Sequence, residues 1–351
     1  MKTKLFKIDP RKPDEEALAE AGALLRQGGV VAFPTETVYG LGANALCEEA
    51  VQKIFKAKGR PSDNPLIIHI SDFSMLEQLV CGVSPMAQAL MEAFMPGPFT
   101  AILKKQAVVS SLVTAGLDTV AVRFPAHPIA KELIRQAGVP VAAPSANLSG
   151  KPSPTNARHV LEDMDGRIEA VIDGGDCAVG VESTVVDLTG AVPVILRPGG
   201  VTYEDIKKKA PGTVIDEHVL RSVSVEEVPK SPGMKYKHYA PEAQVTVVEG
   251  SLQETREEIK KLLGKVRGRR TGVLTMEEDA GFDADCVLFA GADTKAYASK
   301  LFTSLRRFDE NKVEVVFAQL VEDDGYGLAV KNRLYKAAAN HVIHVGRRGR
   351  E

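Results

Sequence analysis

Residues 14–33, DEEALAEAGALLRQGGVVAF, decide the fold class, because a helix pattern leads directly into a strand pattern. Apolar residues recur at helical spacing from Ala17 to Leu25, and the pattern stops at Gly28 and Gly29, as helices often do. The next four residues, 30–33, are all apolar, which is typical of a buried strand. The stretch therefore predicts a helix followed by a strand of a covered sheet.

The same alternation continues along the first 200 residues and predicts an α/β domain. Further helix patterns cover residues 48–58, 84–94 and 128–136. Strand patterns cover residues 66–70, 100–103, 120–123, 139–143, 169–173, 184–188 and 192–196. The strands after residue 165 lie too close together for helical crossovers, so we expect a mixed sheet.

The length of 351 residues favours two domains, since a single hydrophobic core seldom grows that large. We expect a first domain at residues 1–201, a polar linker at 202–241 and a second domain at 242–351. The linker ends in SPGMKYKHYAP (231–241), an aromatic and basic segment with a proline near each end. The last part has strand patterns at 244–248, 271–275, 285–289 and 313–318, and helix patterns at 252–263 and 295–308. It predicts a smaller three-layer α/β domain.

Composition excludes several classes of protein. The net charge of −2 provides no chain-wide positive field, so any RNA contact needs a local patch. The four cysteines lack metal-site spacing and indicate free thiols in a reducing compartment. No stretch approaches the length of a membrane span. We therefore expect a cytoplasmic location.

Two short polar pairs, Lys58 with Arg60 and Ser145 with Asn147, are the strongest functional lead. In an extended segment, side chains two residues apart point the same way, so each pair could face one ligand. Two cations, a hydroxyl and an amide suit a polyphosphate. A basic helix end for the first pair and turn duty for the second remain open alternatives, although Gly59 suggests close approach of the backbone to an anion.

Other polar residues lie at strand ends or inside apolar strands. Residues 33–44, FPTETVYGLGAN, follow a strand directly and suggest a shaped loop, or else an ordinary strand exit. Arg123 lies in an apolar strand and must meet an anion, either a ligand carboxylate or an internal Asp or Glu. His69 also lies in an apolar strand, where a hydrogen-bonded core histidine is the common explanation. Without a Ser-His-Asp pattern or metal cluster, these groups indicate anion binding rather than covalent catalysis.

At these motifs the sequence closely resembles the two-domain threonylcarbamoyl-AMP synthases, whose N-terminal part is a YrdC-like domain. The matching segments are 34–44, 56–70, 119–128, 144–147, 180–184, 197–199 and 231–241. The resemblance implies a YrdC-like twisted, largely mixed sheet with flanking helices, plus a smaller C-terminal Rossmann-like three-layer α/β domain. It also implies a nucleotidyltransferase that combines L-threonine, bicarbonate and ATP into threonylcarbamoyl-AMP and releases pyrophosphate. The product would serve the threonylcarbamoyladenosine modification of tRNA beside the anticodon.

Carried over by motif, the resemblance assigns each site residue to one substrate. The catalytic set would be Lys58, Arg60, Ser145 and Asn147, which also bind ATP. Further ATP contacts would come from Asn64, Thr119, Ser153, Arg197 and Tyr236, with Tyr239 as the alternative tyrosine. L-threonine would be held by Thr37, His69, Arg123, Ala143 and Ser183, with Arg123 on its carboxylate.

The resemblance also implies partners. Mg²⁺ would arrive with ATP, with no metal bound by protein side chains, and a tRNA threonylcarbamoyl transferase would take the product. A weak tRNA contact is left open. The rivals are an RNA-binding module without chemistry of its own, which near-neutral charge and 5% aromatic content disfavour, and carbamoyl transfer in metallocentre maturation, for which zinc-finger cysteines are missing.

Overall fold

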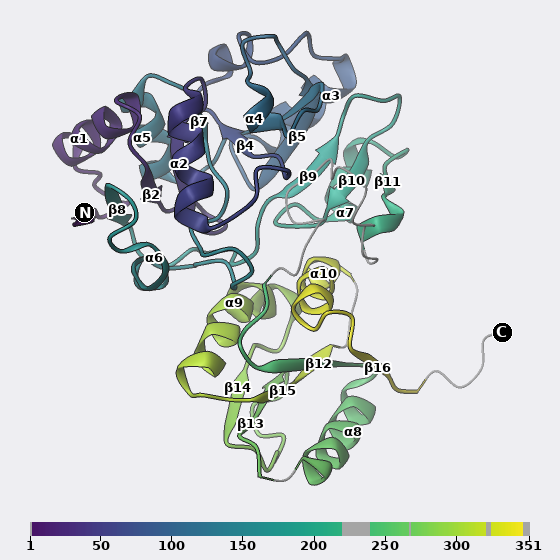
Figure 1. Cartoon of the computed structure of the whole chain (residues 1–351). Helices are drawn as coiled ribbons and strands as arrows, with labels where there is room; N and C mark the ends of the chain where they lie inside the picture. Colours follow the sequence, from purple (N-terminus) through teal and green to yellow (C-terminus); the bar gives the residue numbers. More distant parts are fainter. Residues whose placement is uncertain (1, 220–238, 267, 321–323, 347–351) are drawn as a thin grey trace. The chain divides into compact units, whose positions relative to one another are not determined.

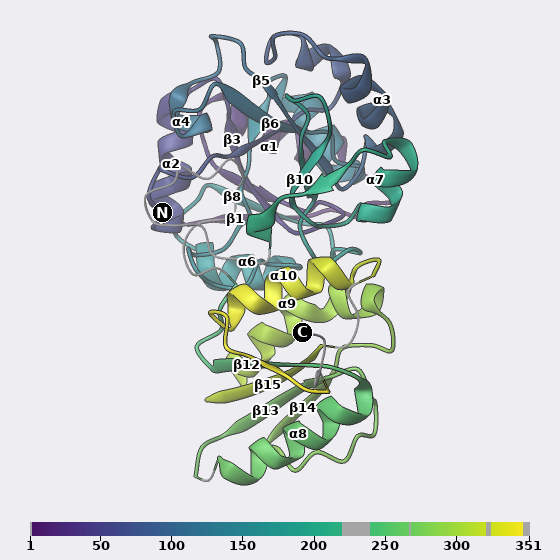
Figure 2. The same ribbon diagram turned by 90° about the vertical axis from the view of Figure 1, so that its right-hand side faces the viewer.

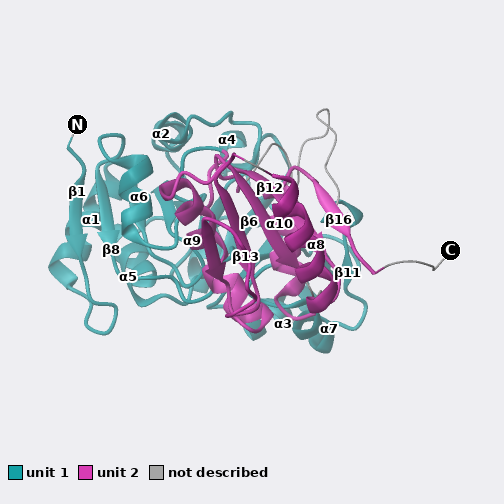
Figure 3. Cartoon of the chain, turned by 90° about the horizontal axis from the view of Figure 1, so that it is seen from below, with its two compact units in different colours: residues 1–149, 153–236 teal, residues 150–152, 237–351 magenta. Residues whose placement is uncertain are grey.

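The computed structural model describes residues 2–219, 239–266, 268–320 and 324–346. It divides into two compact units, coloured separately in Figure 3. Unit 1 comprises residues 1–149 and 153–236, and unit 2 comprises residues 150–152 and 237–351. The short segment 150–152 therefore belongs to unit 2, although the chain on both sides of it belongs to unit 1. The predicted boundaries at residues 201 and 241 stay a prediction.

Unit 1 is built on a mixed sheet, as predicted, and Figure 1 shows its strands. Their order in the described part is β1-β8-β2-β3-β7-β4-β6-β5-β9-β10-β11. The sheet combines parallel pairs such as β4 with β6 and antiparallel pairs such as β5 with β6. The strands are β1 (Lys4–Lys7), β2 (Val31–Phe33), β3 (Gly40–Asn44), β4 (Ile67–His69), β5 (Phe99–Lys104), β6 (Thr119–Arg123), β7 (Val141–Ala142), β8 (Ala170–Asp173), β9 (Thr184–Asp187), β10 (Val194–Arg197) and β11 (Val214–Ile215).

Helices cover both faces of this sheet. On one face, Leu18 and Leu25 of α1 and Leu133 of α5 share a core with β2 and β8. On the other face, α2, α3 and α6 form a larger core with the central strands. The helical segments of unit 1 are α1 (Glu15–Arg26), α2 (Glu48–Lys58), η1 (Phe73–Leu76), α3 (Pro85–Phe94), α4 (Ser111–Thr114), α5 (Pro128–Ala137), α6 (Ala157–Met164), α7 (Tyr203–Lys209) and η2 (Glu217–Val219).

The predicted loop at residues 33–44 is wrong in its second half, because Gly40–Asn44 forms β3, antiparallel to β2. The glycines serve packing there. A Cβ on Gly42 would lie 2.7 Å from the Phe33 ring and 2.8 Å from Val141 Cγ1, closer than carbon atoms can approach. The two glycines of the motif thus fit an aromatic ring against the sheet, and the loop itself is residues 34–39.

The first part of the predicted linker is folded within unit 1. Residues 203–219 form α7, β11 and η2, and β11 extends the sheet by pairing with β10 in parallel. The aromatic and basic segment of the linker falls largely on residues 220–238, outside the described residues.

Unit 2 is a three-layer α/β unit with a parallel sheet. Figure 2 shows α8 on one face of the sheet and α9 and α10 on the other. The strand order is β14-β13-β15-β12-β16, and Ile259 and Leu263 of α8 pack on Val273 and Phe317. The elements are β12 (Gln244–Glu249), α8 (Leu252–Lys265), β13 (Thr271–Thr275), β14 (Cys286–Phe289), α9 (Thr294–Glu310), β15 (Val315–Leu320), α10 (Gly327–Ala337) and β16 (Val342–His344).

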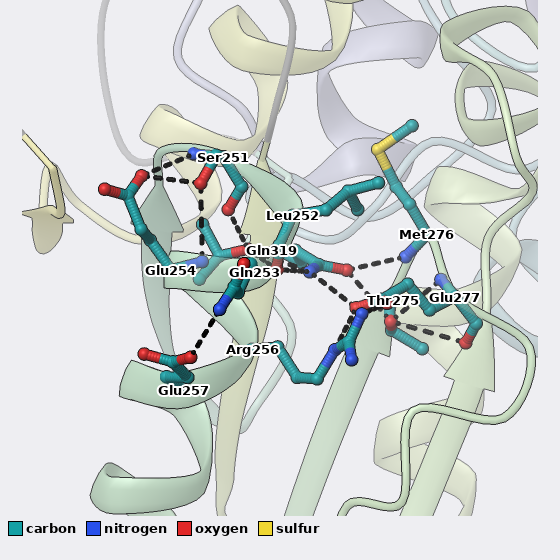
Figure 4. A network of polar contacts seen from close by, with 11 residues as sticks. Ser251, Leu252, Gln253, Glu254, Arg256, Glu257, Thr275, Met276, Glu277 and Gln319 are labelled. Atoms are coloured by element: carbon teal, nitrogen blue, oxygen red, sulfur yellow. Dashed lines mark hydrogen bonds and ion pairs between the residues drawn. The ribbon is translucent and has the colours of Figure 1, made fainter.

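A buried polar network joins β13, β15 and α8 near the carboxyl ends of these strands (Figure 4). Gln319 is its centre: Oε1 accepts from Thr275 Oγ1 and from Met276 N, both at 2.9 Å. Its Nε2 donates to Thr255 Oγ1 at 2.8 Å and to Glu277 Oε2 at 3.2 Å. Both lone pairs and both N–H groups of this fully buried amide are therefore used within unit 2.

Candidate active site

The two polar pairs predicted from the sequence meet through Lys58. Lys58 Nζ donates to the main-chain oxygens of Ser145, at 2.6 Å, and Asn147, at 2.7 Å, and only 3% of the residue is exposed. Ser149 N donates in return to Lys58 O at 3.0 Å. Ser145 Oγ donates to Asn147 Oδ1 at 2.5 Å. Lys58 thus holds the loop of Ser145 and Asn147 after β7 by two hydrogen bonds, and the two pairs form one cluster.

The extended geometry expected for Lys58 and Arg60 is wrong. Lys58 is the last residue of α2, and Gly59 ends the helix in the left-handed conformation, at φ 60° and ψ 39°. A side chain at this position would be strained by the positive φ, so the backbone angles alone account for the glycine, and its approach to an anion stays a prediction. Helix capping explains Gly59, and the turn redirects Arg60, whose Nη2 donates to Asn64 O at 3.0 Å.

Asn64 is buried with its amide unsatisfied. The residue is 0% exposed, yet neither Nδ2 nor Oδ1 has a hydrogen-bond partner among the described residues. A buried amide without partners costs free energy, and native proteins seldom leave one unless a ligand or water completes it. Asn64 therefore marks a place where a polar ligand is expected.

A row of polar residues crosses the sheet from β4 to β9. His69 of β4 pairs in register with Arg123 of β6, and Arg123 pairs with Thr100 of β5. Residues paired in this way present their side chains on the same face. Thr100 Oγ1 is 2.8 Å from Ser183 Oγ, just before β9. The row brings together three predicted threonine contacts, His69, Arg123 and Ser183.

Arg123 meets an internal carboxylate. Its Nη2 donates to Glu36 Oε1 at 2.7 Å, and the two side chains are 4% and 14% exposed. Of the two anions that the sequence left open, the structure shows the internal one. Burial raises the pKa of Glu36, but the charge and hydrogen bond of Arg123, with main-chain donors, outweigh it and leave that pKa below its ordinary value. The Glu36 carboxylate is therefore ionised at neutral pH.

The loop at residues 34–39 determines whether the Thr37 hydroxyl can donate or accept a further hydrogen bond. Thr35 Oγ1 donates to Val38 O at 2.6 Å and is 2.8 Å from Thr37 Oγ1. A hydroxyl has one hydrogen, so Thr37 must be the donor in the second contact. The Thr37 oxygen then has only lone pairs left, which suit an amine or hydroxyl of a ligand rather than a carboxylate.

His69 is a buried neutral histidine. Only 3% of it is exposed, Nδ1 lies 3.2 Å from Ile67 O, and its ring meets that of Phe33 edge-on at 6.1 Å. Burial, and next the charge of Arg123, lower the pKa of His69 to about 3. Its place in the row is therefore held by an uncharged ring.

The remaining predicted residues lie around two further contacts. Arg197 Nη2 donates to Ser183 O at 3.0 Å and to Ser183 Oγ at 3.1 Å, so an arginine predicted for ATP touches a serine predicted for threonine. Ser153 Oγ donates to Glu182 Oε1 at 2.6 Å inside unit 1. Ala143 is buried beside β4, where its N–H donates to Ile67 O.

Along β4 and β6, the predicted ATP and threonine residues lie at opposite ends. His69 and Arg123 end β4 and β6, whereas Thr119 begins β6 and Asn64 precedes β4. Thr119 and Arg123 share a face of β6 about 13 Å apart, because a strand rises about 3.3 Å per residue. β7 runs antiparallel to β4, so Ser145 also lies toward the Asn64 end. Polar residues therefore lie at both ends of β4 and β6.

Of the two tyrosines that the sequence proposed for ATP, only Tyr239 lies within the described residues. Tyr236 lies outside the described residues. Tyr239 is packed within unit 2, with 5% of it exposed and its ring centroid 5.1 Å from that of Phe302. Which of the two faces ATP stays a prediction.

Sequence reasoning did not assign Glu36, Thr35, Thr100 or Glu182. A signal existed for Glu36, since the charge in the apolar strand of Arg123 required an anion and Glu36 follows another apolar strand. Within the described ranges no group of three or more His, Cys, Asp or Glu residues could hold a metal ion. No helix there is long and apolar enough to cross a membrane.

Comparisons with known proteins cover both parts of the chain. A family model described as telomere recombination matches residues 23–199, and one described as threonylcarbamoyl-AMP synthase, C-terminal domain, matches residues 201–339. The threonylcarbamoyl-AMP synthase of Bacillus subtilis is 51% identical, over 98% of this chain and 100% of the relative. That of Pyrococcus abyssi is 50% identical, over 95% of this chain and 97% of the relative.

A solved structure matches the whole fold. The crystal structure of Pyrococcus abyssi Sua5 complexed with L-threonine is similar with a TM-score of 0.93 and 48% identity, over 98% of this chain and 100% of that chain. Full-length similarity at this identity, in sequence and in structure, shows that the chain belongs to the two-domain threonylcarbamoyl-AMP synthase family.

Proposed function

We propose that this chain makes threonylcarbamoyl-AMP from L-threonine, bicarbonate and ATP, with release of pyrophosphate. Relatives that span the whole chain are named for this synthase activity, and one similar structure holds L-threonine. One observation of this molecule carries the proposal: two polar clusters lie on one sheet, the Lys58 cluster with Asn64 toward one end of β4 and the row of His69 and Arg123 at the other. Two substrates could therefore bind side by side.

The Asn64 end would bind ATP. Lys58 and Arg60 supply positive charge, and Ser145 and Asn147 supply polar groups on a loop that Lys58 already holds. The unsatisfied amide of Asn64 would gain its missing hydrogen bonds from the nucleotide. Thr119 would complete this side, with Tyr236 from the linker. Arg197 and Ser153, which contact Ser183 and Glu182, would reach ATP from the threonine end. Mg²⁺ would enter bound to the phosphates of ATP and would neutralise part of their charge.

The other end would bind L-threonine. Arg123 would take the carboxylate, and Thr37 would accept a hydrogen bond from the amine or hydroxyl, which is the polarity that Thr35 leaves to it. His69, Ala143 and Ser183 would line the amino acid. His69, being neutral, would add no charge beside Arg123.

The reaction then needs positioning and charge compensation rather than a protein nucleophile. The threonine amine would attack bicarbonate and lose water to give a carbamate. A carbamate oxygen would attack the α-phosphorus of ATP, and the bond to the pyrophosphate oxygen would break. Both partners are anions, so the cations Lys58 and Arg60 would reduce their repulsion and stabilise the leaving group.

The product would pass to a tRNA threonylcarbamoyl transferase, for the adenosine beside the anticodon, in the cytoplasm. Direct contact with tRNA would be weak, because the net charge is −2. The relatives are named as synthases, which does not support an RNA-binding module without chemistry.

The test is to incubate the purified chain with ATP, Mg²⁺, bicarbonate and L-threonine and to follow pyrophosphate and the adenylate by mass spectrometry. The proposal expects an adenylate carrying one threonine and one carbon from bicarbonate, traced with carbon-13. Pyrophosphate release that ignores threonine would contradict it.

A further inference from the structure

Glu36 carries the negative charge that contacts Arg123, and both of its carboxylate oxygens are used. Oε1 accepts from Arg123 Nη2 at 2.7 Å, and Oε2 accepts from Ala126 N at 3.2 Å. The main chain of Glu36 is also held, because its carbonyl accepts from Val179 N at 2.9 Å. Hydrogen bonds therefore hold both the carboxylate and the main chain of Glu36 before any ligand binds.

Arg123 is held along one side of its guanidinium. Nε points to Gly97 O at 3.4 Å, and Nη2 donates to Glu36. Among the described residues, the other terminal nitrogen, Nη1, has no hydrogen-bond partner. A guanidinium is planar and rigid, so fixing one side determines where the remaining N–H groups point. The N–H groups on the side of Nη1 can therefore donate hydrogen bonds to a substrate carboxylate.

We infer that Glu36 is a positioning residue for the amino-acid substrate: it holds Arg123 by one edge so that the opposite edge receives the carboxylate of L-threonine. This inference rests on the proposed function of Arg123. Glu36 has a second effect, because its negative charge repels a carboxylate from the occupied edge. One orientation of the substrate carboxylate on Arg123 is thereby favoured.

Hydrogen bonds of the threonines beside Glu36 fix the loop that carries its carboxylate. Thr35 closes a tight turn with Val38, through bonds of 2.6 Å from its hydroxyl and 3.3 Å to its hydroxyl. Thr37 O accepts from Gly180 N at 3.2 Å. The backbone on both sides of Glu36 is thus fixed by hydrogen bonds, and a preorganised acceptor loses little entropy when it orients Arg123.

Several titratable groups face Glu36. They are Arg123 on β6, His127 at the start of α5, and Cys177 before β9. Burial lowers the pKa of His127, and the charge of Glu36 partly opposes this. The pKa of Glu36 lies below its ordinary value, so its contribution is present above the ordinary carboxyl pKa and is lost only as pH falls through the lowered one. Glu36 itself should therefore add no pH dependence to threonine binding above the ordinary carboxyl pKa.

The test compares Glu36→Gln, Glu36→Asp and Glu132→Gln in the full chain, with KM measured separately for threonine and ATP. Glu36→Gln keeps the size of the side chain and an acceptor for Ala126 N, but loses the charge. We expect roughly a tenfold rise in the threonine KM, with the ATP KM little changed. Glu36→Asp should recover part of the loss, because it restores the charge at shorter reach. Glu132 pairs with Arg135 on the surface of α5, and Glu132→Gln should change neither constant.

Two controls separate this inference from the proposed function. A wild-type chain that forms no adenylate contradicts the proposed function itself. An active wild type in which Arg123→Ala raises the threonine KM while Glu36→Gln does not would overturn the role of Glu36 alone. Equal rises in both KM values would indicate a merely structural role and would also overturn it. If Glu36→Gln does not fold, Glu36→Asp decides, and an unchanged threonine KM in that variant contradicts the inference.

Discussion

The two units place polar clusters near the ends of their strands, but the clusters differ in what they leave unsatisfied. In unit 2, Gln319 uses every hydrogen-bonding position of its amide within the network of Figure 4. In unit 1, the equally buried amide of Asn64 has no partner among the described residues, and Arg123 is held along one edge.

The difference shows that position alone does not identify a site. The carboxyl ends of parallel strands, where ligands of α/β proteins usually bind, include the Gln319 network. A saturated buried network contributes to stability and to a unique fold. A buried polar group that lacks a partner instead has something to gain from a ligand. We therefore expect changes in unit 1 to affect substrates and changes in the Gln319 network to affect unfolding.

The largest effect is expected for Lys58→Ala. It removes a buried cation and the two bonds that hold the loop of Ser145 and Asn147. Turnover should fall by about 10²–10³-fold, the usual cost of losing a group that stabilises developing charge. The matched control is Lys53→Ala on the same helix, where Nζ donates to Gly28 O at 2.6 Å. Measured pyrophosphate release should be near normal in the control, and a similar loss in both variants would place the effect in helix packing.

Gln319→Ala should destabilise unit 2 without changing the chemistry. Truncation removes the Gln319 bond to Met276 N and one bond each from the Thr255 and Thr275 hydroxyls, and it opens a cavity. We expect a loss of about 2–4 kcal/mol in the free energy of unfolding. Urea denaturation checks this, with Gln253→Ala as control, because the Gln253 side chain donates to Glu257 on the exposed face of α8. If Gln319→Ala kept normal stability but lost kcat, the expectation that the Gln319 network serves stability rather than catalysis would be wrong.

His69 should make unit 1 sensitive to acid. Its folded pKa of about 3 lies below the ordinary value, so the neutral form is favoured in the fold. Stability is then full above the ordinary histidine pKa of about 6.5 and falls as pH drops toward the folded value. Between about pH 6.5 and pH 5 the loss should be about 2 kcal/mol. In His69→Gln, urea midpoints at the two pH values should differ less than in wild type, whereas His341→Gln, on the surface, should behave as wild type does.

The fold was predictable where local pattern and packing agree. The apolar spacing of α1 and α2 defined both helices to within a residue or two, because caps and a glycine end them. β3 was missed because Gly40 and Gly42 disfavour a strand locally, and only the Phe33 ring explains them. β1 was missed too, since alternating lysines suit an exposed edge strand as well as a terminal segment.

The site was predictable as a set of residues but not as a set of contacts. Arg123 required an anion on physical grounds, yet its partner Glu36 is 87 residues away in sequence and only the fold brings them together. Lys58 was predicted for phosphate, but its bonds to the carbonyls of Ser145 and Asn147 depend on the place of β7 in the sheet. Such pairings arise from tertiary structure, which local spacing does not encode.

The smallest expected effect gives the most direct test. Asn64→Ala removes an amide without breaking a hydrogen bond among the described residues, because Arg60 bonds the main-chain oxygen of Asn64. Calorimetric titration of Mg·ATP into wild type, Asn64→Ala and Gln319→Ala compares the two buried amides under one condition. The account predicts about tenfold weaker binding for Asn64→Ala with stability no lower than that of wild type, and wild-type affinity for Gln319→Ala. Wild-type affinity in Asn64→Ala together with lost binding in folded Gln319→Ala would contradict it.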